Sequence, residues 1–152
     1  MATDIPAQQT PFALAYLGDA RYALWCRERV LQLNLGSGPT HERVTQLVRC
    51  QAQARLLRHL LPLLTPAEQQ VCRRGINMKP LSPPKHASIR DYRQATGFEC
   101  LVGYWHLSER WDRFETLMAE DSLQEELRVA TRPSRKAAHQ APKPLAPATP
   151  SR

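Results

Sequence analysis

Apolar residues recur at every third or fourth position along most of this 152-residue chain, and this spacing constrains the fold more than any other feature. It places apolar side chains on one face of an α-helix, whereas no segment shows the alternation of a half-buried strand. The pattern therefore predicts an all-α protein, and the length suits one hydrophobic core. The longest stripe consists of Val44, Leu47, Val48, Leu57, Leu60, Leu61 and Leu64.

Glycine, proline and capping residues divide the chain into predicted helices. Glycine and proline at residues 36–39 end the first helix, and Thr40 is suited to cap the next. The sequence TPAE at residues 65–68 is a capping box with proline at the first helical position. Residues 76–87 contain three prolines and no periodicity, so they predict an exposed basic loop. The predicted helices span about residues 12–34, 40–64, 66–75, 88–107 and 109–129.

Charge is distributed unevenly along the chain, which carries a formal net charge of +7. Residues 131–152 are rich in proline and hold five basic residues and no acid, so they predict a disordered basic tail after a folded domain of residues 1–130. Residues 73–93 hold six basic residues against one acid, whereas residues 109–126 hold seven acids against two arginines. A surface for an anionic partner is expected near residues 73–93.

Other features limit the class of protein. The four cysteines, Cys26, Cys50, Cys72 and Cys100, form no CxxC pair, so neither a disulfide framework nor a zinc cluster is indicated and buried free thiols are expected. No stretch of about 18 apolar residues is present, and the N-terminus lacks the pattern of a secretory signal. We therefore expect a cytoplasmic protein without a membrane partner.

Two strongly apolar segments each carry an acid in their middle. Asp19 lies in PFALAYLGDARYALW and Glu99 in ATGFECLVGYW. Burying an ionised carboxylate costs several kcal/mol unless it is paired or bound to a metal ion. Each acid is therefore expected to have a partner, which is either an arginine such as Arg21 or Arg93 or a bound cation. The composition of these segments leaves both alternatives open.

A glycine accompanies each of these acids. Gly18 precedes Asp19 directly, and Gly97 lies two positions before Glu99. Glycine inside a helix costs roughly 0.5–1 kcal/mol, so its presence indicates that another backbone or a ligand approaches closely.

Three motifs occur in order along the chain. Residues 14–20, LAYLGDA, resemble the signature helix of the ribonuclease III family, and residues 92–104, YRQATGFECLVGY, resemble its second acidic helix. Between them, RRGINMK at residues 73–79 is similar to the RRGRNAK segment of the compact branch called Mini-ribonuclease III, although Ile76 stands where arginine is usual. The resemblance implies the all-α ribonuclease III-type endonuclease fold, in a branch that lacks a double-stranded RNA-binding domain.

The resemblance also implies a function. It assigns Asp19 and Glu99 to the catalytic divalent cation, Mg²⁺ with Mn²⁺ as an alternative, in a homodimer that cleaves double-stranded RNA and matures the precursor of large-subunit ribosomal RNA. Larger members have two further acids where Ala15 and Thr96 stand here, as in the compact branch. A second reading is a non-catalytic RNA-binding or assembly protein that kept the fold. The presence of both Asp19 and Glu99 favours the enzyme.

Candidate RNA contacts lie in the RRGINMK motif and in the predicted loop that follows it. They combine basic side chains for phosphates with one amide for base edges: Arg73, Arg74, Asn77, Lys79 and Lys85.

Overall fold

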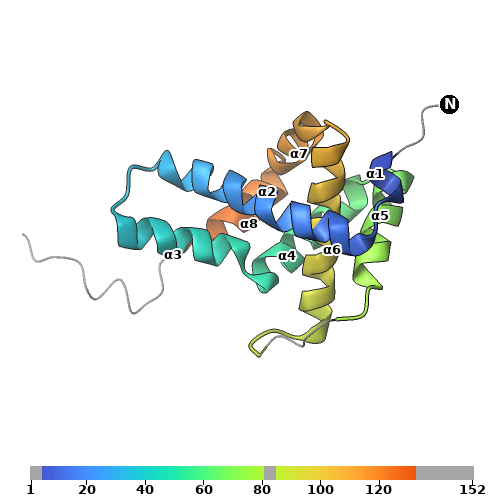
Figure 1. Cartoon of the computed structure of the whole chain (residues 1–152). Helices are drawn as coiled ribbons and strands as arrows, with labels where there is room; N and C mark the ends of the chain where they lie inside the picture. Colours follow the sequence, from blue (N-terminus) through green and yellow to red (C-terminus); the bar gives the residue numbers. More distant parts are fainter. Residues whose placement is uncertain (1–4, 81–84, 133–152) are drawn as a thin grey trace, which may run out of the picture.

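The computed structural model describes residues 5–80 and 85–132. Within these ranges every regular element is a helix, which confirms the all-α prediction (Figure 1). The elements are α1 (Ile5–Gln8), α2 (Pro11–Leu31), α3 (Ser37–Val48), α4 (Cys50–Leu60), the 3₁₀ helix η1 (Leu61–Leu63), α5 (Pro66–Ile76), α6 (Ile89–Leu107), α7 (Trp111–Met118) and α8 (Asp121–Ala130).

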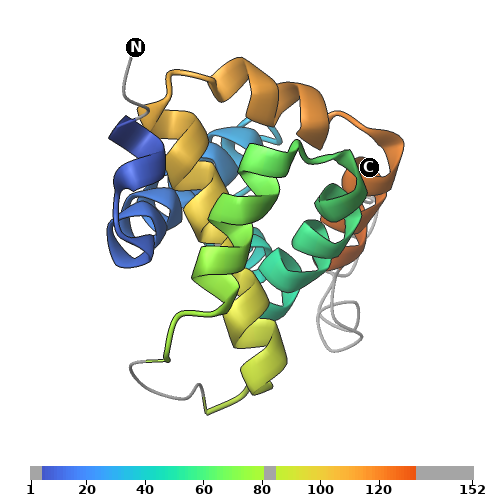
Figure 2. The same cartoon turned by 90° about the vertical axis from the view of Figure 1, so that its right-hand side faces the viewer.

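Helix α6 is the centre of the fold. Helix α2 crosses it on one side, and α5 and α4 pack along other sides (Figures 1 and 2). Every residue from Ala95 to Trp105 is buried except Glu99. A helix that is buried nearly all round lies in the core of a domain. Glu99 is the exception within this stretch, since it is only half-buried.

The crossing of α2 and α6 depends on two glycines. A Cβ atom at Gly18 would overlap the backbone oxygen of Glu99, and one at Gly103 would overlap the backbone oxygen of Leu14. Gly97 faces α5 instead, where a Cβ would lie 2.8 Å from Cγ1 of Ile76. The prediction that Gly18 and Gly97 mark close backbone approaches is therefore confirmed.

Gly75 lies close to the end of α5, which runs to Ile76, so the prediction that the third helix ends near Gly75 is confirmed. A Cβ at Gly75 would lie 2.7 Å from Sγ of Cys100 and 2.9 Å from Cα of Gly97. This glycine therefore also serves the packing of α5 on α6.

The single helix predicted for residues 40–64 is wrong. The helical run starts at Ser37 rather than after a Thr40 cap, and it breaks at Arg49, whose φ and ψ are −59° and 145°. Two side chains replace hydrogen bonds lost at the break. The hydroxyl of Tyr22 donates to the Leu47 carbonyl at 2.9 Å, and Nε2 of Gln53 donates to the Val48 carbonyl at 3.1 Å. Helix α3 packs mainly on α2 and α4 mainly on α6, so the apolar stripe of the sequence is shared between two helices with different partners.

The helix predicted for residues 109–129 is also divided, because Glu120 has extended φ and ψ of −58° and 143°. Nε2 of Gln124 donates to the Met118 carbonyl at 2.6 Å, and its Oε1 accepts from Arg29 at 2.9 Å. The chain can turn between α7 and α8 because a side chain satisfies the exposed carbonyl.

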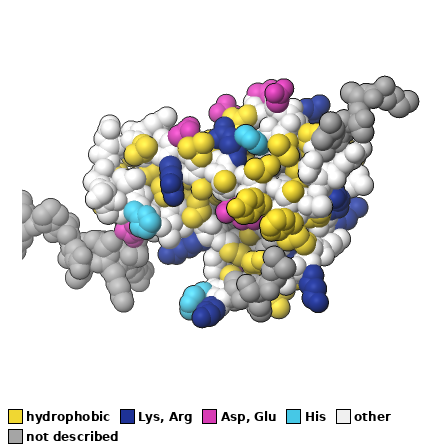
Figure 3. All heavy atoms as spheres, in the orientation of Figure 1, with side chains coloured by type: hydrophobic (Ala, Val, Ile, Leu, Met, Phe, Trp, Pro, Cys, Tyr) yellow, Lys and Arg dark blue, Asp and Glu magenta, His cyan; other side chains and the backbone are white. Residues whose placement is uncertain are grey.

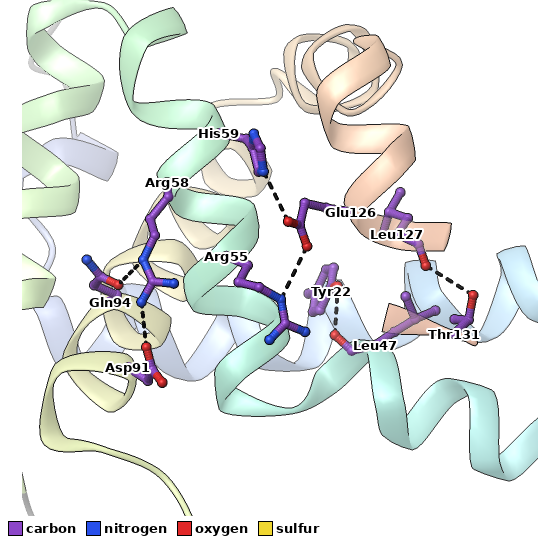
Figure 4. Close-up of polar contacts among 10 residues, drawn as sticks. All are labelled: Tyr22, Leu47, Arg55, Arg58, His59, Asp91, Gln94, Glu126, Leu127 and Thr131. Carbon is purple, nitrogen blue, oxygen red and sulfur yellow. Dashed lines mark hydrogen bonds and ion pairs between the residues drawn. The ribbon is translucent and has the colours of Figure 1, made fainter. Parts of the chain in front are cut away.

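Polar contacts hold α4 between α6 and α8 (Figure 4). Arg55 and His59 both contact the Glu126 carboxylate of α8, at 3.2 and 3.1 Å. Arg58 donates to Asp91 at 2.6 Å and to Gln94 at 3.0 Å, both on α6. These contacts fix the position of α4 relative to α6, the helix that carries Glu99.

Three remaining predictions concern the cysteines, membrane-spanning segments and the C-terminal tail. Cys26, Cys72 and Cys100 are buried free thiols as expected, whereas Cys50 is half-buried. None of the described helices is both long and apolar enough to cross a membrane. The predicted disordered tail falls mainly on residues 133–152, which lie outside the described residues, as do residues 81–84 of the predicted loop.

Candidate active site

A hollow of about 330 Å³ lies between α2, α4 and α6, and it brings the two predicted acids together. Asp19 comes from α2 and Glu99 from α6, 80 positions apart in sequence. The remaining lining is Phe12, Ala15, Tyr16, Val48, Cys50, Gln53, Met78, Tyr92, Ala95 and Thr96. The structure thus places both predicted catalytic residues at one site.

Neither acid has a basic partner among the described residues, where the ion pairs involve other carboxylates. The guanidinium of Arg21 lies over the ring of Trp111, 3.7 Å from its centroid. Arg93 is exposed. The arginine alternative left open by the sequence is therefore not found, and the carboxylates remain available for a ligand.

Asp19 itself corrects part of the sequence reasoning, because it is exposed rather than buried. Helix α2 lies on the outside of α6 and also exposes apolar residues such as Leu24 and Leu31. Apolar composition around Asp19 therefore does not imply burial of Asp19, and the burial argument holds only for the half-buried Glu99.

The electrostatics of the site favour a cation. Burial raises the pKa of Glu99, the nearby Asp19 carboxylate raises it further, and the Gln53 carboxamide opposes both, for a resulting pKa of about 8. Two carboxylates without a counter-charge repel each other, and a divalent cation between them would release the proton from Glu99.

The donor set fits a hard divalent cation such as Mg²⁺, which takes oxygen ligands and keeps several waters. Beside the two carboxylates, the buried Oε1 of Gln53 has no hydrogen-bond partner in the described structure. Ala15 and Thr96 also line the hollow, but alanine offers no donor and the Thr96 hydroxyl is used on the Tyr92 carbonyl at 3.1 Å. In the described residues no group of three or more His, Cys, Asp or Glu side chains is arranged to hold a metal ion, so two carboxylates would be the charged ligands.

Three of the predicted RNA contacts lie next to this site. Arg73, Arg74 and Asn77 line a second hollow of about 480 Å³, which meets the first at Met78, and Arg73 and Asn77 are exposed there. Lys79 and Lys85 are exposed on either side of residues 81–84. The described ends of the predicted loop thus carry basic side chains into solvent.

Arg74 is used differently. Its guanidinium donates to the carbonyls of Ala7 and Gln9 at 2.7 and 2.9 Å, which ties the segment before α2 to α5. Sequence reasoning did not find this structural role. It also overlooked Gln53, although a polar residue on the same stripe as Leu57 and Leu60 was a signal that could have been read.

Exposed aromatic residues border the hollow. Phe12 and Tyr16 stack with ring centroids 5.7 Å apart and are 54% and 71% exposed. Figure 3 shows hydrophobic side chains gathered on the face over which α2 runs, beside a small acidic area. An apolar surface of this kind at a polar site is typical of contacts between macromolecules.

Comparisons with known proteins agree with the fold. Residues 13–110 match the model of the ribonuclease III domain. The chain is 41% identical to Mini-ribonuclease 3 of Symbiobacterium thermophilum over 114 residues, 74% of this chain and 88% of that protein. It is 44% identical to Mini-ribonuclease 3 of Desulfitobacterium hafniense over 107 residues, 70% of this chain and 68% of that protein.

A solved structure also shares the fold. The crystal structure of a protein from Fusobacterium nucleatum superposes with a TM-score of 0.68 at 22% identity, over 73% of this chain and 89% of that one. The matched domain and the helical architecture define the class, an endoribonuclease of the ribonuclease III type. Within that class, the chain belongs to the compact Mini-ribonuclease 3 branch of the ribonuclease III family.

Proposed function

We propose that this chain cleaves double-stranded RNA with the help of a divalent cation, Mg²⁺ or Mn²⁺, held by Asp19 and Glu99. The observation that carries the proposal is the shared hollow in which these two acids lie without a basic partner. A protein that only bound RNA would gain nothing from two unmatched carboxylates, because they repel the phosphate backbone unless a cation lies between. This favours an enzyme over a non-catalytic assembly protein.

The chain's own residues set the geometry of the reaction. A bound divalent cation activates a water molecule and stabilises the charge that develops when a phosphodiester is displaced. Asp19 and Glu99 would hold it from two helices whose separation is fixed by the contact of Gly18 with the Glu99 backbone. The acids can therefore keep their relative position through the reaction.

We propose that RNA binds on the basic surface around the second hollow, which meets the acidic site at Met78. Exposed Arg73, Lys79 and Lys85 are suited to phosphates, and Asn77 can hydrogen-bond a base edge or a 2′-hydroxyl. Arg74 borders the same hollow and keeps N–H groups beyond the two it uses on the backbone.

We also propose that the chain acts as a homodimer. The exposed, stacked pair of Phe12 and Tyr16 beside the acids supports an interface that brings two sites to one duplex. Replacing Tyr16 by glutamate is expected to shift the mass measured by light scattering from two chains to one. A monomeric wild-type protein would contradict this proposal without affecting the cation site.

The finer biological role is proposed from the branch to which the chain belongs. We propose a cytoplasmic enzyme that acts on the precursor of large-subunit ribosomal RNA, with residues 1–130 as catalytic domain and residues 131–152 as a basic tail that adds affinity for RNA. Accumulation of unprocessed precursor in cells that lack the protein would support this substrate, and normal processing would contradict it.

The cleavage experiment uses purified full-length protein, a long RNA duplex and Mg²⁺. Asp19→Asn is expected to abolish cleavage and to leave folding and duplex binding nearly intact, because the carboxamide keeps the shape and loses the charge. Asp112→Asn, at an exposed position on α7, is the matched control and should cleave normally. Near-normal cleavage by Asp19→Asn, or cleavage by the wild type in EDTA, would overturn the proposal.

A further inference from the structure

Gln53 on α4 has an oxygen that the fold does not use. The side chain is buried, with 2% exposure, and its Nε2 donates to the Val48 carbonyl at 3.1 Å. Because a carbonyl only accepts, this contact identifies which end of the carboxamide is oxygen. That oxygen, Oε1, is buried without a hydrogen-bond partner in the described structure. Leaving a buried acceptor unpaired is destabilising, so a partner is expected.

Two other glutamines show that capping alone does not explain this oxygen. Gln124 in α8 and Gln69 in α5 occupy the same position, the fourth after the N-cap, and each donates to a carbonyl before its helix, at 2.6 and 3.3 Å. Oε1 of Gln124 accepts from Arg29, and Gln69 is exposed. Only Gln53 among these three combines the cap with a buried, unpaired oxygen.

The surroundings of Gln53 indicate what this oxygen is for. Gln53 lines the same hollow as Asp19 and Glu99, and within that hollow Thr96 directs its hydroxyl to the backbone. The contacts of Arg58 with α6 and of Arg55 with α8 hold α4 in place, so the carboxamide is presented from a fixed helix (Figure 4). A neutral amide oxygen is a ligand that hard cations accept, directly or through one of their waters.

We infer that Gln53 is a positioning residue of the cation site, whose Oε1 binds the divalent cation or one of its waters as a third oxygen donor beside Asp19 and Glu99. This inference rests on the proposed function, because it requires that the two acids hold a cation. The carboxamide then has three roles: one N–H caps α4 at the Val48 carbonyl, the NH₂ group also faces the Glu99 carboxylate and lowers its pKa, and the oxygen completes the site.

The test measures Mn²⁺ binding to the full-length protein without RNA, by the electron paramagnetic resonance signal of free Mn²⁺. Gln53→Met removes the cap, the N–H that faces Glu99 and the oxygen, and it is expected to raise the Kd for Mn²⁺ about ten-fold, the effect typical of residues that support a metal site. Gln124→Met removes the equivalent cap in α8 and should leave the Kd unchanged. Thermal unfolding without Mn²⁺ shows whether the two variants lose comparable stability.

Gln53→Glu separates the cap from the oxygen. A carboxylate cannot donate to the Val48 carbonyl, so the cap is lost as in Gln53→Met, but it provides oxygen and negative charge. The inference predicts that Gln53→Glu binds Mn²⁺ at least as tightly as the wild type. A role in capping alone predicts that it binds no better than Gln53→Met, and this result would overturn the inference.

Asp19→Asn distinguishes a failure of the inference about Gln53 from a failure of the proposed cation site. If Asp19→Asn loses Mn²⁺ binding and Gln53→Met keeps the wild-type Kd, only the role of Gln53 is refuted. If Asp19→Asn also keeps the wild-type Kd, the proposed cation site itself is refuted, and the inference about Gln53 with it.

Discussion

The carboxylate of Glu68 is the most strongly bonded polar group in the described core, and its replacement gives a quantitative test of the fold. Its side chain is 4% exposed. Oε1 accepts from the Thr65 backbone N–H at 2.8 Å and from Arg113 at 2.9 Å, and Oε2 accepts from Trp105 Nε1 at 2.7 Å and from Arg113 Nε at 3.2 Å. Each oxygen thus faces two donors.

These bonds determine how Glu68 titrates. Burial alone would raise its pKa, but hydrogen bonds from Arg113, the Thr65 N–H and Trp105 outweigh burial and lower the pKa from 4.5 to about 2. Because the folded-state pKa lies below the unfolded-state value, the ionised group stabilises the fold above about pH 5, and this contribution is lost as the pH falls toward 2. The shift corresponds to about 3 kcal/mol at neutral pH, of which about 2 kcal/mol is lost by pH 3.

Glu68→Gln is the perturbation. Whichever way the amide turns, its NH₂ group faces two donors, so the variant is expected to lose about 3 kcal/mol or more of unfolding free energy at pH 6. Urea unfolding followed by circular dichroism at pH 6 and pH 3 measures this loss, with Glu115→Gln, an exposed acid on α7, as control. At pH 3 the gap between wild type and variant should shrink by about 2 kcal/mol, to roughly two fifths of its value at pH 6. A gap below about 1 kcal/mol at pH 6, or one equal at both pH values, would refute the reasoning.

Three further predictions concern the crossing of α2 and α6, the two loop lysines and residues 131–152. Gly18→Ala should destabilise the protein by about 3 kcal/mol and abolish cleavage, because the added methyl separates α2 from α6, whereas Gly38→Ala, which meets no atom within 4 Å, should do neither; urea unfolding and a cleavage assay check both. Lys79→Ala combined with Lys85→Ala should weaken binding to all duplexes alike. It should also lower the slope of log Kd against log salt concentration by the amount expected for about two lost phosphate contacts, as measured by titration at several salt concentrations. Deletion of residues 131–152 should weaken RNA binding and its salt dependence while mapped cut positions stay the same, and new cut positions would contradict this role.

The parts of the fold that the sequence predicted are those fixed by local chemistry. The capping box at Thr65 and the helix start at Ser88 both occur, because each uses a side chain and a backbone N–H three residues apart. The glycine beside each acid predicted a close approach, because a missing Cβ has few other uses in a helix. These signals need no knowledge of distant residues.

The breaks at Arg49 and Glu120 could not be predicted in the same way. At Arg49 one exposed carbonyl is satisfied by a distant donor, Tyr22, which lies 25 positions before its acceptor Leu47. At Glu120 the donor Gln124 is local, but its oxygen is held by the distant Arg29. Apolar periodicity does not reveal such a break, because the apolar spacing continues in the sequence although the helices on either side pack on different partners. Gln53 was not predicted for a similar reason, because its proposed role depends on Asp19 of α2 and Glu99 of α6, which only the fold brings into the same hollow.

Two acids of this chain show how one fold uses opposite electrostatic arrangements for structure and for a site. Glu68 is surrounded by donors that lower its pKa, so its charge stabilises the fold above about pH 5. Burial and the neighbouring Asp19 raise the pKa of Glu99, so its ionisation costs stability as the pH rises from the unfolded-state value toward 8. A fold selected for stability alone would place an arginine beside Glu99, as it does beside Glu68. The unmatched charge is instead retained where a cation can bind, which is the pattern expected when a site is maintained against the local preference of the fold.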